Sequence, residues 1–369
     1  MIMRLFSVLV ICVSIGFFSS CSSDEAPISS LCPTIDEADQ TALFEFYKDE
    51  LIIPAYTQAV SDVQVLKSGL DNFLNNPSTD NLLDVQNQFK TAYLSWEYAE
   101  PFYFGPAEDQ LIEDHFNYFP IDMENLQLAI QNGFDSDLTE KYDRGFPAMD
   151  YLLFNGSESE IIEALTQSDV RTYLLANIEN MESRIVAVEE AWRGSFGASF
   201  VANTGKADGA SLSQIINTYN RHFETIKRNR IGLPSGILTL GFKQPQVVEG
   251  FYSAMSLELA KASVAASSAY FYGHVGGTDA HRSIYSLLND LELLSGNERL
   301  ADKMDAEIKV FANHLDDING TLDYAVEFET ETINELYQSM SGFVVLAKTD
   351  MPTALCISIT YVDNPSDSD

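Results

Sequence analysis

The sequence predicts an all-α protein made of two packed helical bundles. Apolar residues recur at steps of three and four through most of the chain, which is the period of an amphipathic helix. The sequence has no long segments that alternate apolar and polar residues, and no Gly-rich phosphate loop. One short strand is favoured near the C-terminus, because β-branched residues cluster at 357–362.

Residues 1–20 predict a secretory signal, because Arg4 precedes an apolar run that is too short to span a bilayer. The sequence from Phe18 to Cys21 resembles a bacterial lipobox, so we expect Cys21 to be the lipidated first residue of the mature protein. The alternative is ordinary signal-peptide cleavage that leaves Cys21 unmodified. Residues 21–35 then form a flexible polar tether, in which Ser22 favours sorting to a Gram-negative outer membrane.

The first helical domain is expected to span residues 36–195. Pro54 should kink or split a helix over 36–76, and Pro101 should stop a second helix over 80–100. Further helices are expected at 122–131, 147–154 and 158–192. The Gly- and Ser-rich segment from Gly194 to Ser211 is the predicted linker between the domains.

The second helical domain is expected to span residues 196–363, and residues 364–369 form an acidic tail. The apolar pattern predicts helices at 211–231, 245–272, 280–293, 299–318 and 321–348. Two cysteines, Cys32 and Cys356, lie at opposite ends of the mature chain in an oxidising compartment. We predict a disulfide between them, with two buried free thiols as the alternative.

The chain has 369 residues and a formal net charge of −34. This charge argues against binding to nucleic acid through the overall electrostatic field. Most acidic runs are expected to be solvated surface, and weak attraction of cations is the alternative.

The stretch from Arg144 to Gly156 places Asp150 in an apolar run that begins after Gly145, with Pro147 at a helix entrance. A carboxylate in such surroundings has a partner or a shifted pKa. The stretch resembles the Gly-x-His-x-x-Glu signature of imelysin-like proteins. Gly145 keeps the Gly, Asp150 replaces the Glu, and Pro147 occupies the His position. A Trp-containing acidic helix before Gly105-Pro106 and segments in the second half of the sequence also resemble these proteins. The resemblance therefore covers about residues 36–363.

The resemblance implies two packed helical domains, a pocket around the signature, and either metallopeptidase activity or metal uptake. Pro147 has no lone pair to offer a metal, and a zinc hydrolase normally needs three protein ligands. A divalent metal ion is therefore only a weak expectation. Its candidate ligands are Asp150, His274, Asp279 and His281.

Glu97 and Glu100 share a helix face at a C-terminal end, where the helix dipole disfavours acids, so a cation or a basic partner is expected nearby. The cluster Arg221, Lys227, Arg228 and Arg230 is one candidate partner, and Arg144 is another. The site then either binds a hard cation such as calcium or is a salt-bridged network without an ion. The expected pocket residues are Glu97, Glu100, Arg144, Gly145 and Asp150.

These observations predict an imelysin-like lipoprotein of the cell envelope, held at the membrane by Cys21. We expect a non-catalytic binding or accessory protein for metal (iron) uptake or peptide binding. Its ligand would be a metal ion, a metal complex or a peptide. The alternatives are a metallopeptidase that uses Asp150 with ligands from elsewhere, and a structural component of an envelope complex.

Overall fold

A computed structural model describes residues 32–137, 141–274 and 282–361. The predicted signal, Cys21, most of the tether, the acidic tail, Asp279 and His281 lie outside the described residues. Pro33–Asp369 forms one compact unit by its contacts. The all-α prediction is confirmed, because the sheet of the described part is a hairpin of two-residue strands, β1 (Leu294–Ser295) and β2 (Glu298–Arg299). The division into two domains stays a prediction.

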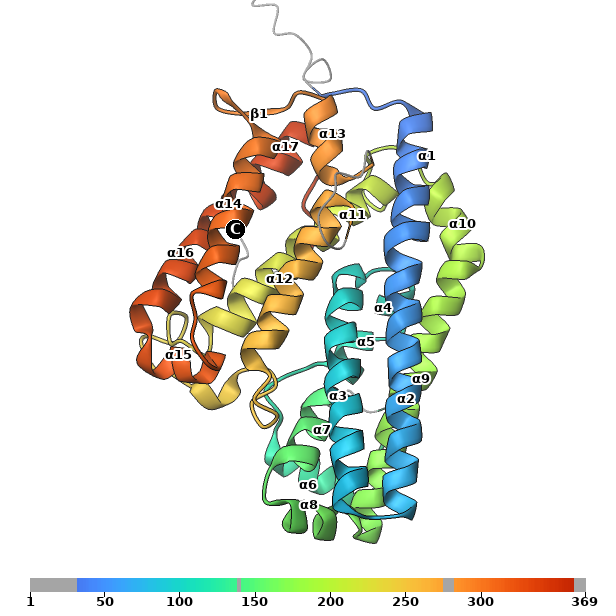
Figure 1. The fold of residues 1–369 in the computed structure, drawn as a ribbon. Helices are drawn as coiled ribbons and strands as arrows, with labels where there is room; N and C mark the ends of the chain where they lie inside the picture. The colour runs from blue at the N-terminus through green and yellow to red at the C-terminus, as the bar shows by residue number, and fades with distance from the viewer. Residues whose placement is uncertain (1–31, 138–140, 275–281, 362–369) are drawn as a thin grey trace, which may run out of the picture. The chain divides into compact units, whose positions relative to one another are not determined.

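The first half is organised around three long helices (Figure 1). The helix α2 (Ile53–Asn75) packs along α3 (Thr79–Ala99) and α9 (Ser168–Arg193). The run into α2 begins with α1 (Glu37–Phe46) and a π-helix, η2 (Tyr47–Ile52). The remaining helical elements of this half are short: η3 (Glu100–Phe102), α4 (Pro106–Asp109), α5 (Ile112–Phe116), α6 (Met123–Asn132), α7 (Gly145–Phe154), α8 (Glu158–Leu165) and α10 (Ser195–Ala202).

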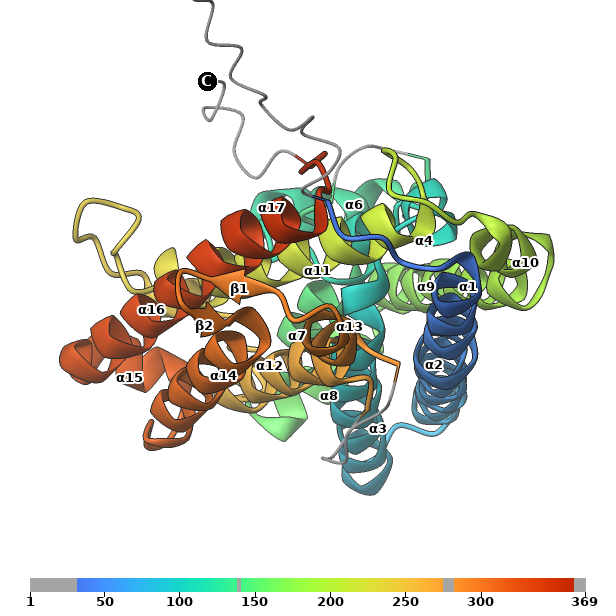
Figure 2. The ribbon, with the colours of Figure 1, turned by 90° about the horizontal axis from the view of Figure 1, so that it is seen from above.

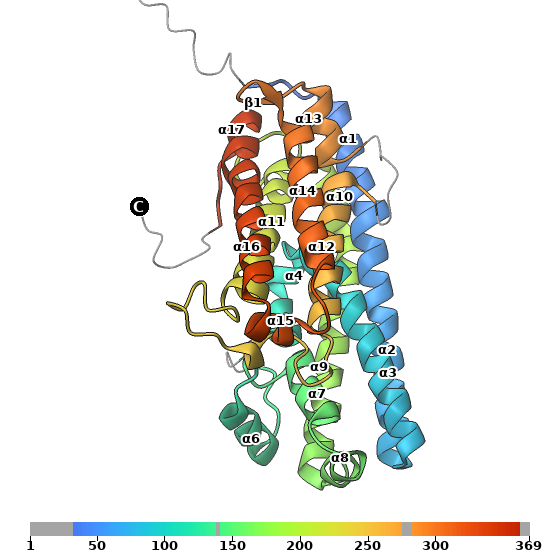
Figure 3. The same ribbon diagram turned by 60° about the vertical axis from the view of Figure 1, so that its left-hand side comes forward.

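In the second half, α11 (Ser211–Thr225) and α12 (Ser256–Tyr272) lie between the α1–α2 run and the pair α14 (Leu300–Asp316) and α16 (Thr330–Val345) (Figure 2). The pair α14 and α16 packs side by side, as Figure 3 shows from another direction. The other elements of this half are η4 (Ile226–Gly232), η5 (Pro245–Val247), α13 (Ile284–Asp290), α15 (Leu322–Phe328), η6 (Leu346–Asp350) and α17 (Met351–Leu355).

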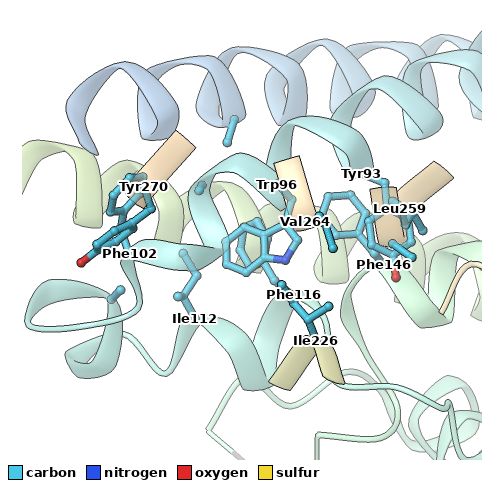
Figure 4. Packing of buried hydrophobic residues seen from close by; sticks show 14 of the residues in the cluster. Tyr93, Trp96, Phe102, Ile112, Phe116, Phe146, Ile226, Leu259, Val264 and Tyr270 are labelled. Atoms are coloured by element: carbon cyan, nitrogen blue, oxygen red, sulfur yellow. The ribbon is translucent and has the colours of Figure 1, made fainter. Parts of the chain in front are cut away.

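Both halves contribute to one aromatic core (Figure 4). Tyr93 on α3 stacks on Phe146 of α7, with ring centroids 4.5 Å apart. Phe102 stacks on Tyr270 of α12 at 5.1 Å, so the two halves of the sequence meet in this core. Large aromatic side chains bury much apolar area each, and this area holds α7 and η3 against α3 and α12.

Three π-helices interrupt the α-helical runs of the described chain, and a proline follows each of them by two residues. These prolines are Pro54 after η2, Pro234 after η4 and Pro352 after η6. A proline lacks an N–H, and its ring clashes with the carbonyl four residues earlier. A widened turn relieves this clash, and the predicted interruption at Pro54 takes this form.

The predicted linker contains a helix, α10, and its role as a domain boundary stays a prediction. Phe196 and Phe200 each contact Trp192 edge-on, at 4.9 and 5.1 Å, so tertiary packing orders a segment whose composition indicated a loop. The predicted single helix over 158–192 is wrong. It is two helices, α8 and α9, because the chain leaves the helical path at Gln167.

The strand expected at 357–362 does not form in the part that the structure describes, 357–361. The amide of Asn217 replaces a neighbouring strand there. Its Nδ2 donates to the Ser358 carbonyl at 3.0 Å, and its Oδ1 accepts from the Thr360 N–H at 2.8 Å. The extended end of the chain therefore pairs with a side chain.

Cys32 and Cys356 are each disulfide-bonded. Their pairing with each other stays a prediction. We expect non-reducing peptide mapping of the mature protein to yield one linked peptide that contains both residues, and reduction to release two. Free thiols at both positions, or links to other cysteines, would contradict it. Among the described helices, none is both long and apolar enough to cross a bilayer.

Candidate functional site

The centre of the candidate site is Arg230, which lies in η4 and is 1% exposed. Its Nη2 donates to Glu97 Oε2 at 2.8 Å and to Glu100 Oε2 at 2.9 Å. Its Nε donates to Glu249 Oε2 at 2.6 Å. Glu97 on α3 and Glu100 on η3 therefore contact an arginine of the predicted basic cluster. Of the two arrangements that the sequence allows, a bound cation or a salt-bridged network, this geometry corresponds to the network.

The Arg230 cluster, which we define as Arg230 with Glu97, Glu100 and Glu249, holds three carboxyl groups around one guanidinium. Burial, with Glu249 and Glu100 close by, outweighs Arg230 and raises the pKa of Glu97 well above its usual range. Burial also acts against ionisation of Glu100, but Arg230 and His222 lower the pKa of Glu100 to about 2. The pKa values of the two glutamates are thus shifted in opposite directions, although the residues are three positions apart.

A chain of hydrogen bonds extends the cluster back into the aromatic core. Asn117 Nδ2 donates to Glu249 Oε1 at 2.5 Å, and the Tyr93 hydroxyl donates to Asn117 Oδ1 at 2.7 Å. On the other side, the ring of His222 contacts Glu100 Oε2 through Nε2 at 3.3 Å. Burial lowers the pKa of His222 against the pull of Glu100, which favours the neutral ring.

Asp150 is held by a different part of the same segment that supplies Glu249. The backbone N–H groups of Tyr252 and Ser253 donate to its two oxygens, each at 2.9 Å. Burial raises the pKa of Asp150 to about 6, although hydrogen bonds from Ser253 and Tyr252 oppose the shift. The residues between Glu249 and Ser253 therefore connect the Arg230 cluster to the signature helix α7.

Arg144 and Gly145 position α7, and they lie apart from the three glutamates of the Arg230 cluster. Arg144 is 1% exposed, and its Nε donates to Asp143 at 2.8 Å. Gly145 has φ +71°, and a Cβ there would lie 2.2 Å from the carbonyl oxygen of Phe116. A glycine is required at this position because no side chain fits between the two backbones.

A pocket of about 240 Å³ opens beside Asp150. Pro147 and Asp150 of α7 form one wall, and the other walls are the segments 119–123 and 246–252. The residue at the His position of the signature is therefore an apolar wall of this pocket. Among the described residues, no group of three or more His, Cys, Asp or Glu side chains is placed to hold a metal ion.

The grouping of the weak metal candidates stays a prediction. His274 lies just after α12, and Asp279 and His281 fall outside the described ranges. Sequence reasoning missed Glu249, Asn117 and His222. Glu249 carried a usable signal, because it is a lone acid in an otherwise uncharged segment after Pro245.

Comparison with known proteins places the chain in a family. The sequence model of imelysin (peptidase M75) matches residues 52–341. The chain belongs to the imelysin family. A stretch of 141 residues is 26% identical to iron-regulated protein A of Synechococcus elongatus, and it covers 38% of this chain and 36% of that protein.

Two solved structures share the imelysin-like fold. A candidate iron-regulated protein A precursor from Parabacteroides distasonis superposes with a TM-score of 0.74 at 18% identity, over 86% of this chain and 96% of the other. An imelysin-like protein from Psychrobacter arcticum gives a TM-score of 0.67 at 16% identity, over 89% of this chain and 99% of the other. At these identities the likeness concerns the fold.

Proposed function

We propose that this imelysin-family chain is a lipid-anchored, non-catalytic binding protein of the cell envelope that takes part in iron uptake. One observation carries the proposal. The acids of the candidate site are already engaged, Glu97 and Glu100 by Arg230 and Asp150 by two backbone N–H groups. These contacts hold the acids in place beside an open pocket, as in a binding site, although Glu97 Oε1 and Arg230 Nη1 have no hydrogen-bond partner among the described residues. The name of the Synechococcus relative supports the link to iron.

The competing proposal, a metallopeptidase, is favoured by the peptidase name of the family. The two proposals differ in metal content and in cleavage. We expect mature wild-type protein purified in metal-free buffer to contain no stoichiometric zinc and to leave peptides intact. Restoring the signature with Pro147→His plus Asp150→Glu should create zinc binding. Tight zinc in the wild type that is lost together with cleavage in Asp150→Ala would establish the peptidase.

Binding itself is tested by equilibrium dialysis with an iron hydroxamate chelate and with a set of tripeptides. Val247 lines the pocket and is half-buried, so Val247→Trp should fill the cavity and abolish saturable binding. Binding that Val247→Trp leaves unchanged would place the site elsewhere. If the wild type neither binds nor cleaves any probe, the structural role in an envelope complex replaces this proposal.

The anchor is tested separately. We expect Cys21→Ser to abolish lipidation and to release the protein from membranes, because the apolar run of the signal ends directly at Cys21. The word precursor in the name of the Parabacteroides neighbour supports a protein of the envelope or exterior. The measurement is fractionation followed by mass analysis of the N-terminal peptide. A variant that sediments with membranes as the wild type does would contradict the lipoprotein assignment.

A further inference from the structure

The residues that line the pocket beside Asp150 are mostly apolar, and its polar side chains are those of Gln246, Tyr252 and Asp150. Among its lining residues, Asp150 is the one that ionises near neutral pH, and none is basic. Aromatic rings of Phe119, Phe251 and Tyr252 contribute to the walls. A ring face attracts a cation through its quadrupole, and a buried carboxylate attracts one by direct charge. An anionic group finds no positive partner among these lining side chains.

The carboxylate of Asp150 keeps capacity for a ligand. Each of its oxygens accepts one backbone N–H, from Tyr252 and from Ser253, and the Ser253 side chain is a further hydrogen-bond partner, so about three of the roughly four acceptor positions of the carboxylate are used. Asp150 follows Pro147 by three residues on α7, so both side chains lie on the pocket face of that helix. The two N–H donors hold the carboxylate in place before any ligand arrives, which lowers the entropy lost on binding.

Arg230 lies behind one wall of this pocket, and glutamates surround its charge. Its guanidinium lies 5.7 Å from the centroid of Phe119, a ring of the pocket wall. Its Nε and Nη2 groups donate to the carboxylates of Glu97, Glu100 and Glu249, whereas Nη1 has no hydrogen-bond partner among the described residues. The charge behind the wall is therefore not positive, and it gives no attraction to an anion in the pocket.

The size of the pocket limits what enters it. A volume of about 240 Å³ is below the range of about 300–1,000 Å³ that is usual for ligand pockets. That space accommodates a single extended arm of a ligand and excludes a whole peptide or a whole metal chelate.

We propose that the Asp150 pocket binds the alkylammonium arm of a larger ligand, with the ammonium group against the Asp150 carboxylate and the methylenes against the apolar walls. This inference rests on the proposed binding function and specifies its ligand class. Such an arm occurs as the side chain of a lysine in a peptide and as the tail of an amine-bearing iron chelate.

Calorimetric titration of the mature protein with two matched pairs of probes tests the inference. The first pair is an iron hydroxamate chelate with a free alkylammonium tail and the same chelate acetylated on that amine. The second pair is a lysine tripeptide and its norleucine counterpart. We expect removal of the ammonium to weaken binding at least tenfold in the pair that corresponds to the natural ligand. The pair that binds thus distinguishes the two sources.

Three variants complete the test. Asp150→Asn should lower the affinity for the ammonium probe at least tenfold. Val247→Trp should abolish binding of this probe while all contacts of Asp150 stay in place. Asp114→Asn removes the same charge from a half-buried surface pair with Lys141 and should leave binding unchanged. Equal binding of both members of a pair, lost in Val247→Trp, would overturn the cationic arm and leave the binding function standing. Absence of binding by all four probes would overturn both.

Discussion

Arg230→Met is expected to lower the free energy of unfolding by about 3–5 kcal/mol, the range for removing one partner of a buried ion pair. The substitution keeps an unbranched apolar stem but leaves Glu100 and Glu249 buried, at 5% and 2% exposure, without their cation. Burial of an uncompensated charge costs more than the loss of the pair itself. Urea denaturation at pH 7, followed by circular dichroism, measures the difference.

The matched control is Arg221→Met on α11. Arg221 makes a two-pronged pair with Glu113, at 2.6 and 2.5 Å, but the two side chains are 32% and 22% exposed. Water rehydrates a partner left behind there, so we expect a loss of about 1 kcal/mol. Equal losses of unfolding free energy in the two variants would show that burial does not determine the contribution of Arg230 to stability.

Glu100→Gln and Glu97→Gln are expected to act in opposite directions at neutral pH. Glu100→Gln removes an ionised acceptor of Arg230 and should cost about 2–3 kcal/mol, the worth of a hydrogen bond to a charged group. The folded pKa of Glu97 is raised, so the folded state disfavours the ionised side chain, at a cost in free energy that Gln avoids. We therefore expect Glu97→Gln to stabilise the protein or leave it unchanged.

The pH dependence separates the two residues further. The folded pKa of Glu97 lies above its unfolded value, so the advantage of Glu97→Gln should grow as the pH rises above about 4.3 and vanish below it. The folded pKa of Glu100 is about 2, so its contribution is present above the unfolded value and disappears as the pH falls towards 2. Unfolding free energies of the variants between pH 3 and 8 check both. A loss in Glu97→Gln equal to that in Glu100→Gln would mean that Glu97 is ionised.

Most of the fold could be predicted because helical periodicity is a local property of the sequence. The pattern predicts a helix at 80–100 where α3 spans 79–99, and one at 122–131 where α6 spans 123–132. The errors arise where contacts between residues far apart in the sequence determine the local structure. Phe200 holds α10 in place by packing on Phe44 and Phe104, and Asn217 replaces a strand partner for residues 358–360. Neither contact leaves a periodic signal in its own segment.

The candidate site was predictable in part for the same reason. The spacing of Glu97 and Glu100 on a helix end indicated a basic partner, and the cluster that contains Arg230 was a candidate. That Glu249 completes the cluster depends on the path of the chain between Pro245 and α12, where the short helix η5 is followed by turns and not by the predicted long helix. Sequence spacing indicates which residues share one helix face, but it does not indicate which segments meet across the core.

The π-helix at η4 has a consequence for any helical wheel drawn through this region. A π-turn holds more residues than an α-turn. A helical wheel that extends the α-helical spacing of α11 through 226–232 therefore places Arg230 on the wrong side of the helix. Pro234, four residues after Arg230, is the visible mark of the change in phase. In related sequences, a proline four residues after an arginine would mark a π-helix at the same place. A helical wheel corrected for the extra residue of that turn would then place the arginine on the side that faces the core.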